Sequence, residues 1–172
     1  MSTDFKPYIR DIPDFPTKGI LFRDITPLLQ NGPVFRRAIQ ALAARHQGQR
    51  PSAVVAIESR GLIVGSALAY ELGIGVVPVR KKGKLPHKTY RASYTLEYGQ
   101  DTLEIHQDAL AAGDRVLLVD DLLATGGTMG ATIQLIQQCG AQILELAFLI
   151  ELTGLQGRQR LQPHPVLSLV QY

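Results

Sequence analysis

Residues 116–129, VLLVDDLLATGGTM, place two adjacent acids and a glycine-rich turn directly after an apolar run. The turn at 125–128 offers small side chains, hydroxyl groups and backbone N–H donors where a helix should begin, and such a helix start binds phosphate well. The GxxxxGK[ST] spacing of a P-loop and the GxGxxG spacing of a dinucleotide-binding loop are both absent from this segment. We therefore expect a phosphate cradle of another kind.

Asp120 and Asp121 narrow the choice of ligand. Two carboxylates about 5 Å apart repel each other by roughly 3 kcal/mol at an effective dielectric constant near 20. They need a partner that offers donors or positive charge, and both ribose hydroxyls and a hydrated Mg²⁺ meet this need. A sugar phosphate fits the order of the motif, with the two acids on its 2′ and 3′ hydroxyls; the alternative is a solvated acidic turn. The predicted 5′-phosphate contacts are Ala124, Thr125, Gly126, Gly127 and Thr128.

A second candidate anion site follows the apolar run at 53–57. Ser59 and Gly61 flank Arg60, and a guanidinium can bind phosphate through two parallel hydrogen bonds. This site could hold a second anion such as pyrophosphate. The alternative is a surface arginine paired with Glu58.

A basic segment also predicts an anionic ligand. Six of the eighteen Lys and Arg residues fall within twelve positions that contain no acid. They are Arg80, Lys81, Lys82, Lys84, Lys88 and Arg91.

The elements that must position these residues follow an α/β pattern. Short β-branched runs alternate with helical periodicity, which is typical of βαβ units around a mostly parallel, doubly wound sheet. Ligands of such sheets bind beyond the carboxyl ends of the strands. We expect strands at 53–57, 75–79, 116–119, 143–152 and 166–170, a loop at 58–61, and helices at 34–46, 62–73 and 127–140.

Two stretches interrupt this alternation. Residues 1–30 contain several prolines and are expected to run extended as a hood, with a helical turn near the end. Residues 81–106 begin as an irregular basic loop and end in an alternating arm, Tyr94, Leu96 and Tyr98, turned at Gly99-Gln100. A long irregular segment in a compact domain is usually a functional loop or disorder, and the family resemblance given below implies a mobile catalytic loop at 81–106.

The bulk properties set the class of protein. With 172 residues, 45% of them hydrophobic and 19% charged, the chain suits one soluble domain spanning 1–172. Cys139 is the only cysteine and cannot form an internal disulfide. Because the sequence has neither a basic-then-apolar leader nor a long uncharged apolar run, we expect a cytoplasmic protein without membrane contact.

Together these segments resemble the type I phosphoribosyltransferases, whose motif is an apolar strand, two acids and a TGGT-like loop. The resemblance is greatest to the members that use adenine and covers nearly the whole chain. One departure is Leu62, where an aromatic residue often follows the ESRG glycine. The matching segments outside 116–129 are FPTKGILFRDITPLL (15–29), IESRG (57–61), RKKGKLP (80–86), YTLEYG (94–99) and ELTGLQGRQRL (151–161).

The resemblance implies a reaction. Adenine attacks C1 of phosphoribosyl pyrophosphate, pyrophosphate leaves and AMP forms, with Mg²⁺ bridging pyrophosphate and sugar oxygens. Such a transfer passes through an oxocarbenium-like state, so the protein must stabilise the leaving anion and exclude water, and needs no nucleophile of its own. The magnesium would be held mainly by substrate and water near Asp120 and Asp121, with no direct protein ligand.

The resemblance also assigns roles. One loop cation would come from a neighbouring subunit, which implies a homodimer. Glu97 would be the acid/base near the adenine N7 or N9 proton, unless it is only a solvated hairpin carboxylate, and Tyr98 would close over the site or pack as an ordinary aromatic. Pyrophosphate would contact Ser59, Arg60, Gly61, Lys81 and Lys84, and adenine would contact Phe22, Leu122 and the backbone of Leu21 and Arg23.

Three alternatives stay open at this point. If backbone groups recognise the edge of the base, no side chain determines the choice among adenine, hypoxanthine, guanine and xanthine. The prediction of adenine therefore depends on the resemblance alone. A nucleic-acid-binding regulator with the same fold would also use a basic loop, although we expect no nucleic-acid partner. A phosphoacceptor signalling domain would use strand-end acids to hold Mg²⁺ but has no use for the TGGT loop.

Overall fold

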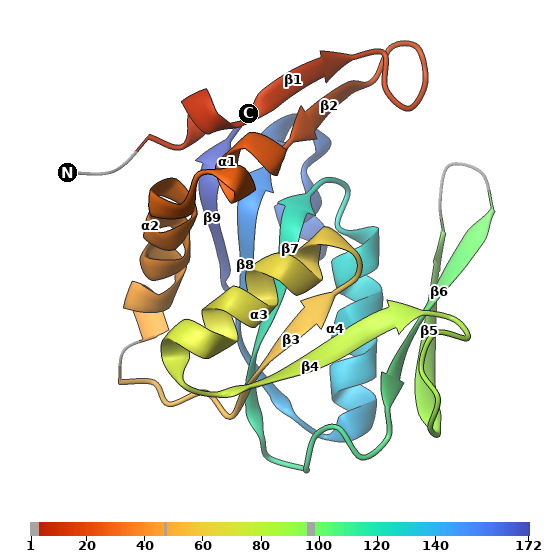
Figure 1. Cartoon of the computed structure of the whole chain (residues 1–172). Coiled ribbons are helices and arrows are strands. Elements are labelled where there is room, and N and C mark those ends of the chain that lie inside the picture. Colours follow the sequence, from red (N-terminus) through yellow and green to blue (C-terminus); the bar gives the residue numbers. More distant parts are fainter. Residues whose placement is uncertain (1–3, 47, 96–98) are drawn as a thin grey trace.

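A computed structural model of the chain describes residues 4–46, 48–95 and 99–172 (Figure 1). Its centre is a seven-stranded sheet in the order β5-β6-β4-β3-β7-β8-β9. The five strands from β4 to β9 in this order run parallel, whereas β6 pairs antiparallel with β4 and β5 antiparallel with β6. The prediction of a mostly parallel α/β sheet is confirmed. The strands are β3 (Ala53–Ile57), β4 (Gly75–Lys81), β5 (Thr89–Thr95), β6 (Gln100–His106), β7 (Arg115–Leu123), β8 (Gln142–Glu151) and β9 (Val166–Gln171).

Helices cover both faces of this sheet, as a doubly wound fold requires. Asn31 begins α2 by accepting a hydrogen bond from the Val34 amide at 3.2 Å. Both α3 and α4 end at a glycine in the left-handed region, Gly73 with φ +68° and Gly140 with φ +72°. The helices are η1 (Lys6–Tyr8), α1 (Thr26–Gln30), α2 (Gly32–Ala43), η2 (Ala44–His46), α3 (Arg60–Leu72), α4 (Gly127–Cys139), η3 (Thr153–Leu155) and α5 (Gly157–Arg160).

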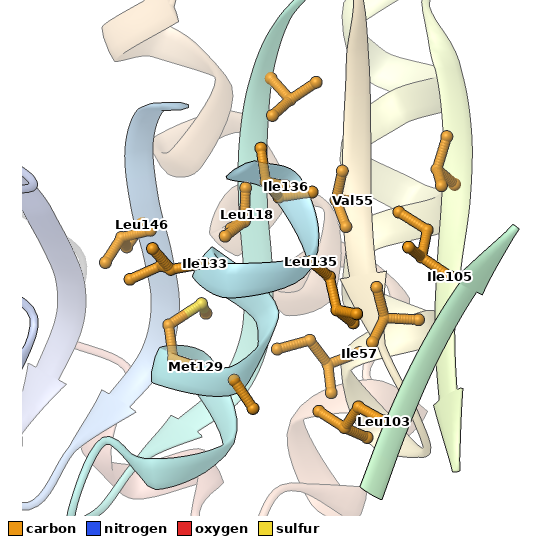
Figure 2. Packing of buried hydrophobic residues seen from close by; sticks show 14 of the residues in the cluster. Val55, Ile57, Leu103, Ile105, Leu118, Met129, Ile133, Leu135, Ile136 and Leu146 are labelled. Carbon is orange, nitrogen blue, oxygen red and sulfur yellow. The ribbon is translucent and has the colours of Figure 1, made fainter. Parts of the chain in front are cut away.

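The two faces bury separate apolar clusters. On one face α4 packs against the strands through Met129, Ile133 and Ile136, which meet residues such as Leu118 and Leu146 (Figure 2). On the other face α2 and α3 pack against the opposite side of β3, β7 and β8. The sheet is therefore held between two layers, and its strand ends are fixed relative to one another.

The hood is more regular than the sequence predicts. Residues Arg10–Pro13 form β1 and Leu21–Asp24 form β2, and these strands pair antiparallel as a hairpin followed by the short helix α1. The hairpin lies above the carboxyl ends of β7 and β8 (Figure 1). Ile9 and Ile25 flank the hairpin and are buried in the core on the α2 and α3 side, so both of its roots are anchored.

Several predicted boundaries are wrong, and the differences nearest the strand ends with candidate site residues are the following. β7 continues to Leu123 instead of ending at 119, because its pairing with the long strand β8 includes Asp120 opposite Phe148 and Leu122 opposite Ile150. Asp120 and Asp121 therefore lie in the end of a strand and not in a loop. The segment 58–61 is only partly a loop, since α3 begins at Arg60. The helix predicted over 34–46 divides into α2 and the 3₁₀ turn η2.

The basic segment leads into the predicted hairpin. β5 and β6 pair antiparallel with Tyr94 opposite Asp101 and Thr95 opposite Gln100, so the predicted pairing of two strands is confirmed. Gln100, which was predicted in the turn, is instead the first residue of the returning strand. Leu96, Glu97 and Tyr98 lie outside the described residues.

Candidate functional site

The phosphate loop connects β7 to α4. Gly126 stands at the N-cap of α4 with φ +85°, a left-handed conformation that favours glycine. The loop and helix start surround a small pocket of about 60 Å³. Because the first N–H groups of a helix lack intrahelical acceptors, this pocket suits an anion. Its lining is Asp120, Leu122, Leu123, Ala124, Thr125, Gly126, Gly127, Thr128, Met129 and Phe148, which includes all five predicted phosphate contacts.

Gly157 supports the back of this loop. A Cβ atom there would lie 2.2 Å from the Ala124 carbonyl oxygen, so only glycine fits without a shift of the loop. The next residue, Arg158, is fixed by Glu151 through a hydrogen bond of 2.9 Å from Nε to Oε1. The α5 segment therefore braces the phosphate loop. Sequence reasoning missed this role, although the resembling tail at 151–161 contained the residues.

The two acids lie in different surroundings. The Asp121 amide donates to Asp120 Oδ1 at 2.8 Å, and a Cβ atom on Gly61 would lie only 2.6 Å from the same oxygen. Burial and the adjacent Asp121 carboxylate raise the pKa of Asp120 well above its ordinary value. The close approach at Gly61 brings the start of α3 against the end of β7, so the two predicted anion sites form one site.

Arg60 connects the acids to the hood. Its Nε lies 2.8 Å from Oδ2 of the buried Asp121, and its guanidinium carbon lies 4.8 Å from the centre of the Phe22 ring. The Arg60 side chain keeps 30% exposure, which leaves the guanidinium reachable by a ligand. The alternative pairing of Arg60 with Glu58 is wrong, because Glu58 accepts from Arg80 Nε at 2.7 Å.

The basic segment is partly neutralised within the protein. Lys81 Nζ lies 3.0 Å from Asp101 Oδ2, and this contact raises the pKa of Lys81 and lowers that of Asp101. Arg91 Nε lies 2.7 Å from Glu104 Oε1, and Arg80 is paired as described above. Three of the six cations of the basic segment, Arg80, Lys81 and Arg91, therefore have acidic partners within the protein. Lys84 is exposed, and its amide donates to the Lys81 carbonyl at 3.2 Å.

The predicted base-binding residues lie on two elements. Leu21, Phe22 and Arg23 form part of β2, where Leu21 is 46% exposed and Phe22 packs edge-on against Phe15 at 5.1 Å between ring centres. Leu122 is half-buried at the end of β7 and lines the phosphate-loop pocket. Phe22 reaches the rest of the site through Arg60, which the sequence did not predict.

Among the described residues, no group of three or more His, Cys, Asp and Glu side chains is placed to hold a metal ion. Within the same residues, no helix combines the length and apolar character needed to cross a membrane.

A family of known proteins matches most of the chain. The family described as "Phosphoribosyl transferase domain" matches residues 25–167. The match includes the phosphate loop, both acids, Arg60 and the basic segment. The chain belongs to this phosphoribosyltransferase family.

Three similar members of the family are adenine phosphoribosyltransferases by name. The adenine phosphoribosyltransferase of Carboxydothermus hydrogenoformans is 60% identical over 169 residues, which cover 98% of this chain and 99% of the relative. The crystal structure of the Rhodothermus marinus adenine phosphoribosyltransferase has a TM-score of 0.93 at 54% identity, covering 98% of this chain and 96% of that one. The Saccharomyces cerevisiae enzyme of the same name, complexed with D-2,5-dideoxy-2,5-imino-altritol 1,6-bisphosphate and adenine, has a TM-score of 0.92 at 41% identity, covering 96% of each chain.

Proposed function

We propose that this chain transfers the 5-phosphoribosyl group of phosphoribosyl pyrophosphate to adenine, giving AMP and pyrophosphate, as in purine salvage. The main observation in favour of this proposal is the ion pair of Arg60 with Asp121. This ion pair joins the candidate pyrophosphate-binding residue to a candidate ribose-binding residue beside the phosphate loop. The names of the full-length relatives support adenine as the acceptor.

The sugar phosphate binds at the end of β7. The backbone N–H groups and hydroxyls of residues 124–128 hold the 5′-phosphate at the start of α4. The ribose hydroxyls donate to Asp120 and Asp121, which offsets the cost of keeping two carboxylates together in a partly buried site.

The leaving pyrophosphate binds where α3 begins. Arg60 offers a planar set of N–H donors, and the amides of Ser59 and Gly61 lie beside it at the helix start. Lys81 and Lys84 add positive charge from the basic segment, so negative charge that develops on the leaving group is stabilised.

Glu97 is assigned the acid/base role at the adenine N7 or N9 proton by family resemblance alone. By the same resemblance, Tyr98 is assigned the role of closing over the site.

The residues present fit a magnesium ion that arrives with the substrate. Asp120 and Asp121 are neighbours at the end of β7, where the Asp121 amide donates to Asp120 Oδ1 at 2.8 Å. Mg²⁺ commonly keeps waters and binds through one or two carboxylates plus substrate phosphates. Substrate oxygens and water would mainly hold the ion near Asp120 and Asp121, without a direct protein ligand, and when bound it supplies charge neutralisation for the pyrophosphate.

The base is placed between the hood and β7. Phe22 offers a ring face, Leu122 an apolar wall, and the backbone of Leu21 and Arg23 offers polar groups to the edge of the base. Arg60 lies over the Phe22 ring in this structure, so base and pyrophosphate sites are adjacent.

A homodimer is part of the proposal. The outer face of α3 exposes Ile63 at 47% and Tyr70 at 89%, and an apolar groove of about 370 Å³ between α2 and α3 includes Phe35, Ile39 and Tyr70. Exposed apolar surface of this kind often marks an interface. Sedimentation should give twice the mass of one chain, and Tyr70→Glu should shift it toward the monomer; a monomeric native protein would reject the dimer.

The same proposal includes a single domain over 1–172, the hood at 1–30, the catalytic loop at 81–106 and a cytoplasmic location.

The test of the activity is incubation with phosphoribosyl pyrophosphate, Mg²⁺ and one purine base at a time. Adenine should give AMP at least tenfold faster than hypoxanthine, guanine or xanthine gives its nucleotide, roughly the selectivity that one well-formed hydrogen bond supplies. Turnover of hypoxanthine without turnover of adenine would reject the assignment.

A further inference from the structure

We propose that Tyr172 is a positioning residue for the base site, because its ring fixes the orientation of strand β2 through Arg23. The inference rests on the proposed function, since β2 is the strand assigned to adenine. Tyr172 lies outside the family match at 25–167 and is not one of the predicted site residues.

The contact between Arg23 and Tyr172 is a close stacking. The guanidinium carbon of Arg23 lies 3.7 Å from the centre of the Tyr172 ring, and Lys6 Nζ lies 5.1 Å from the same centre. Arg23 is also paired with Asp11 on the neighbouring strand, and its side chain is only 14% exposed. A cation over the face of an aromatic ring is attracted by the ring quadrupole, and burial strengthens this attraction. The Arg23 side chain is thereby held in one place.

Tyr172 is itself fixed to the main sheet. Its amide donates to the Glu151 carbonyl at 3.0 Å, and its carbonyl accepts from the Thr153 amide at 2.9 Å and the Thr153 hydroxyl at 2.7 Å. These bonds attach the residue to the end of β8, and the C-terminus lies next to β1 (Figure 1). The ring is therefore a fixed point against which the hood is oriented.

Holding Arg23 also orients Phe22. Successive side chains of a strand point to opposite faces, so an Arg23 side chain that faces Tyr172 leaves Phe22 facing away from it. On that opposite side the Phe22 ring meets Arg60 at 4.8 Å. An isolated two-stranded hairpin is only marginally stable, so the β1–β2 pair needs such a contact to keep its orientation.

The inference predicts separate effects on the two substrates. Loss of the ring should weaken adenine binding, because β2 carries the base contacts. It should leave phosphoribosyl pyrophosphate binding intact, because the phosphate loop and acids lie on β7 and α4. The fold should survive, since Ile9 and Ile25 still anchor both roots of the hairpin.

Two substitutions at one position test the inference. Tyr172→Leu keeps apolar volume but removes the ring face, and Tyr172→Phe keeps the ring face but removes the hydroxyl. We expect Tyr172→Leu to raise the KM for adenine about tenfold, as loss of a desolvated cation–π contact would, with kcat and the KM for phosphoribosyl pyrophosphate changed by less than about twofold. Tyr172→Phe should have the same KM for adenine as the native protein.

A substrate-free measurement accompanies the kinetics. Amide hydrogen exchange of residues 21–24 should be faster in Tyr172→Leu than in the native protein and native-like in Tyr172→Phe. Equal losses in both variants, a parallel rise in both KM values, or unchanged exchange and KM in Tyr172→Leu would overturn the inference. If the native protein forms AMP and Tyr172→Leu behaves like it, only the role of Tyr172 is rejected. If the native protein never forms AMP, the proposed function is rejected.

Discussion

Arg60 and Asp121 form an ion pair, with 2.8 Å between Nε and Oδ2, that joins the start of α3 to the end of β7. Glycine at position 61 makes this possible, because a side chain there would collide with Asp120. The two strand ends that the sequence analysis treated as separate anion sites thus share one charged centre. The same guanidinium contacts Phe22. The candidate binding sites for the sugar, the pyrophosphate and the base therefore meet at Arg60.

Asp121→Asn should mainly weaken phosphoribosyl pyrophosphate binding. The change removes a charged acceptor for a ribose hydroxyl and the ion-pair partner of Arg60. We expect the Kd to rise about tenfold, or about 1.4 kcal/mol, a typical value for a hydrogen bond to a charged group. Calorimetric titration measures this directly. Asp108→Asn, at a carboxylate with 72% exposure, is the control and should bind normally; unaltered affinity in Asp121→Asn would count against the assignment of ribose hydroxyls to this acid.

Gly157→Ala should disturb the phosphate loop from behind. The added methyl group would lie 2.2 Å from the Ala124 carbonyl oxygen and 2.9 Å from Leu123 Cδ1, so the loop must shift. Overpacking of this kind costs about 1–3 kcal/mol of unfolding free energy, and the KM for phosphoribosyl pyrophosphate should rise as well.

Gly154→Ala is the matched control for this change. Gly154 lies in the same segment, but a Cβ atom there meets no atom within 4 Å. Its stability and KM should stay close to native. Similar behaviour of the two alanine variants in thermal unfolding and kinetics would remove the bracing role of Gly157.

Glu151→Gln should destabilise the protein in a pH-dependent way. Hydrogen bonds from Arg158 and the Ser168 hydroxyl, with Arg158 the main cause, lower the pKa of Glu151 below its ordinary value of 4.5. A lowered folded-state pKa means that the ionised form is favoured by folding, so this contribution is present at neutral pH and is lost as pH falls below 4.5 through the folded pKa.

Denaturant unfolding of native and Glu151→Gln protein over a series from neutral pH into this acidic range measures the effect. The difference in unfolding free energy should be about 2 kcal/mol near pH 7, since charge-assisted hydrogen bonds are lost from a buried carboxylate, and should shrink as pH falls. A difference that stays constant or grows on acidification would show that the charge of Glu151 is not the cause.

Glu97→Gln should lower kcat more than substrate affinity. Glu97 lies outside the described residues, so this prediction depends on the resemblance of the YTLEYG segment alone. A proton-transfer group acts mainly in the transition state and contributes roughly 100-fold or more to the rate. Glu71→Gln, at an exposed position of α3, is the control. A native kcat in Glu97→Gln would reject the acid/base role.

Much of the fold and site could be predicted from local patterns. The alternation of short β-branched runs with helical periodicity predicted the mostly parallel sheet, and the glycines after the two acids predicted the start of a helix, which is α4. The arm with Tyr94 was predicted from its period-two alternation, and its strands pair as expected.

The remaining features depend on contacts between distant residues. The true length of β7 is set by pairing with β8, and the partner of Glu58 proved to be Arg80, 22 positions away. Gly157 and Tyr172 act on the loop and the hood through packing that no local pattern encodes. The pairing of Lys81 in the basic segment with Asp101 was also not predicted, because Asp101 comes from the returning strand β6.

Formation of AMP from adenine can be measured with the purified protein. Purified protein is mixed with phosphoribosyl pyrophosphate, Mg²⁺ and adenine, and AMP and pyrophosphate are quantified against time. We expect equal amounts of AMP and pyrophosphate, formed only when adenine is present. Pyrophosphate release that does not depend on adenine, or no AMP at all while another purine base yields its nucleotide, would contradict it.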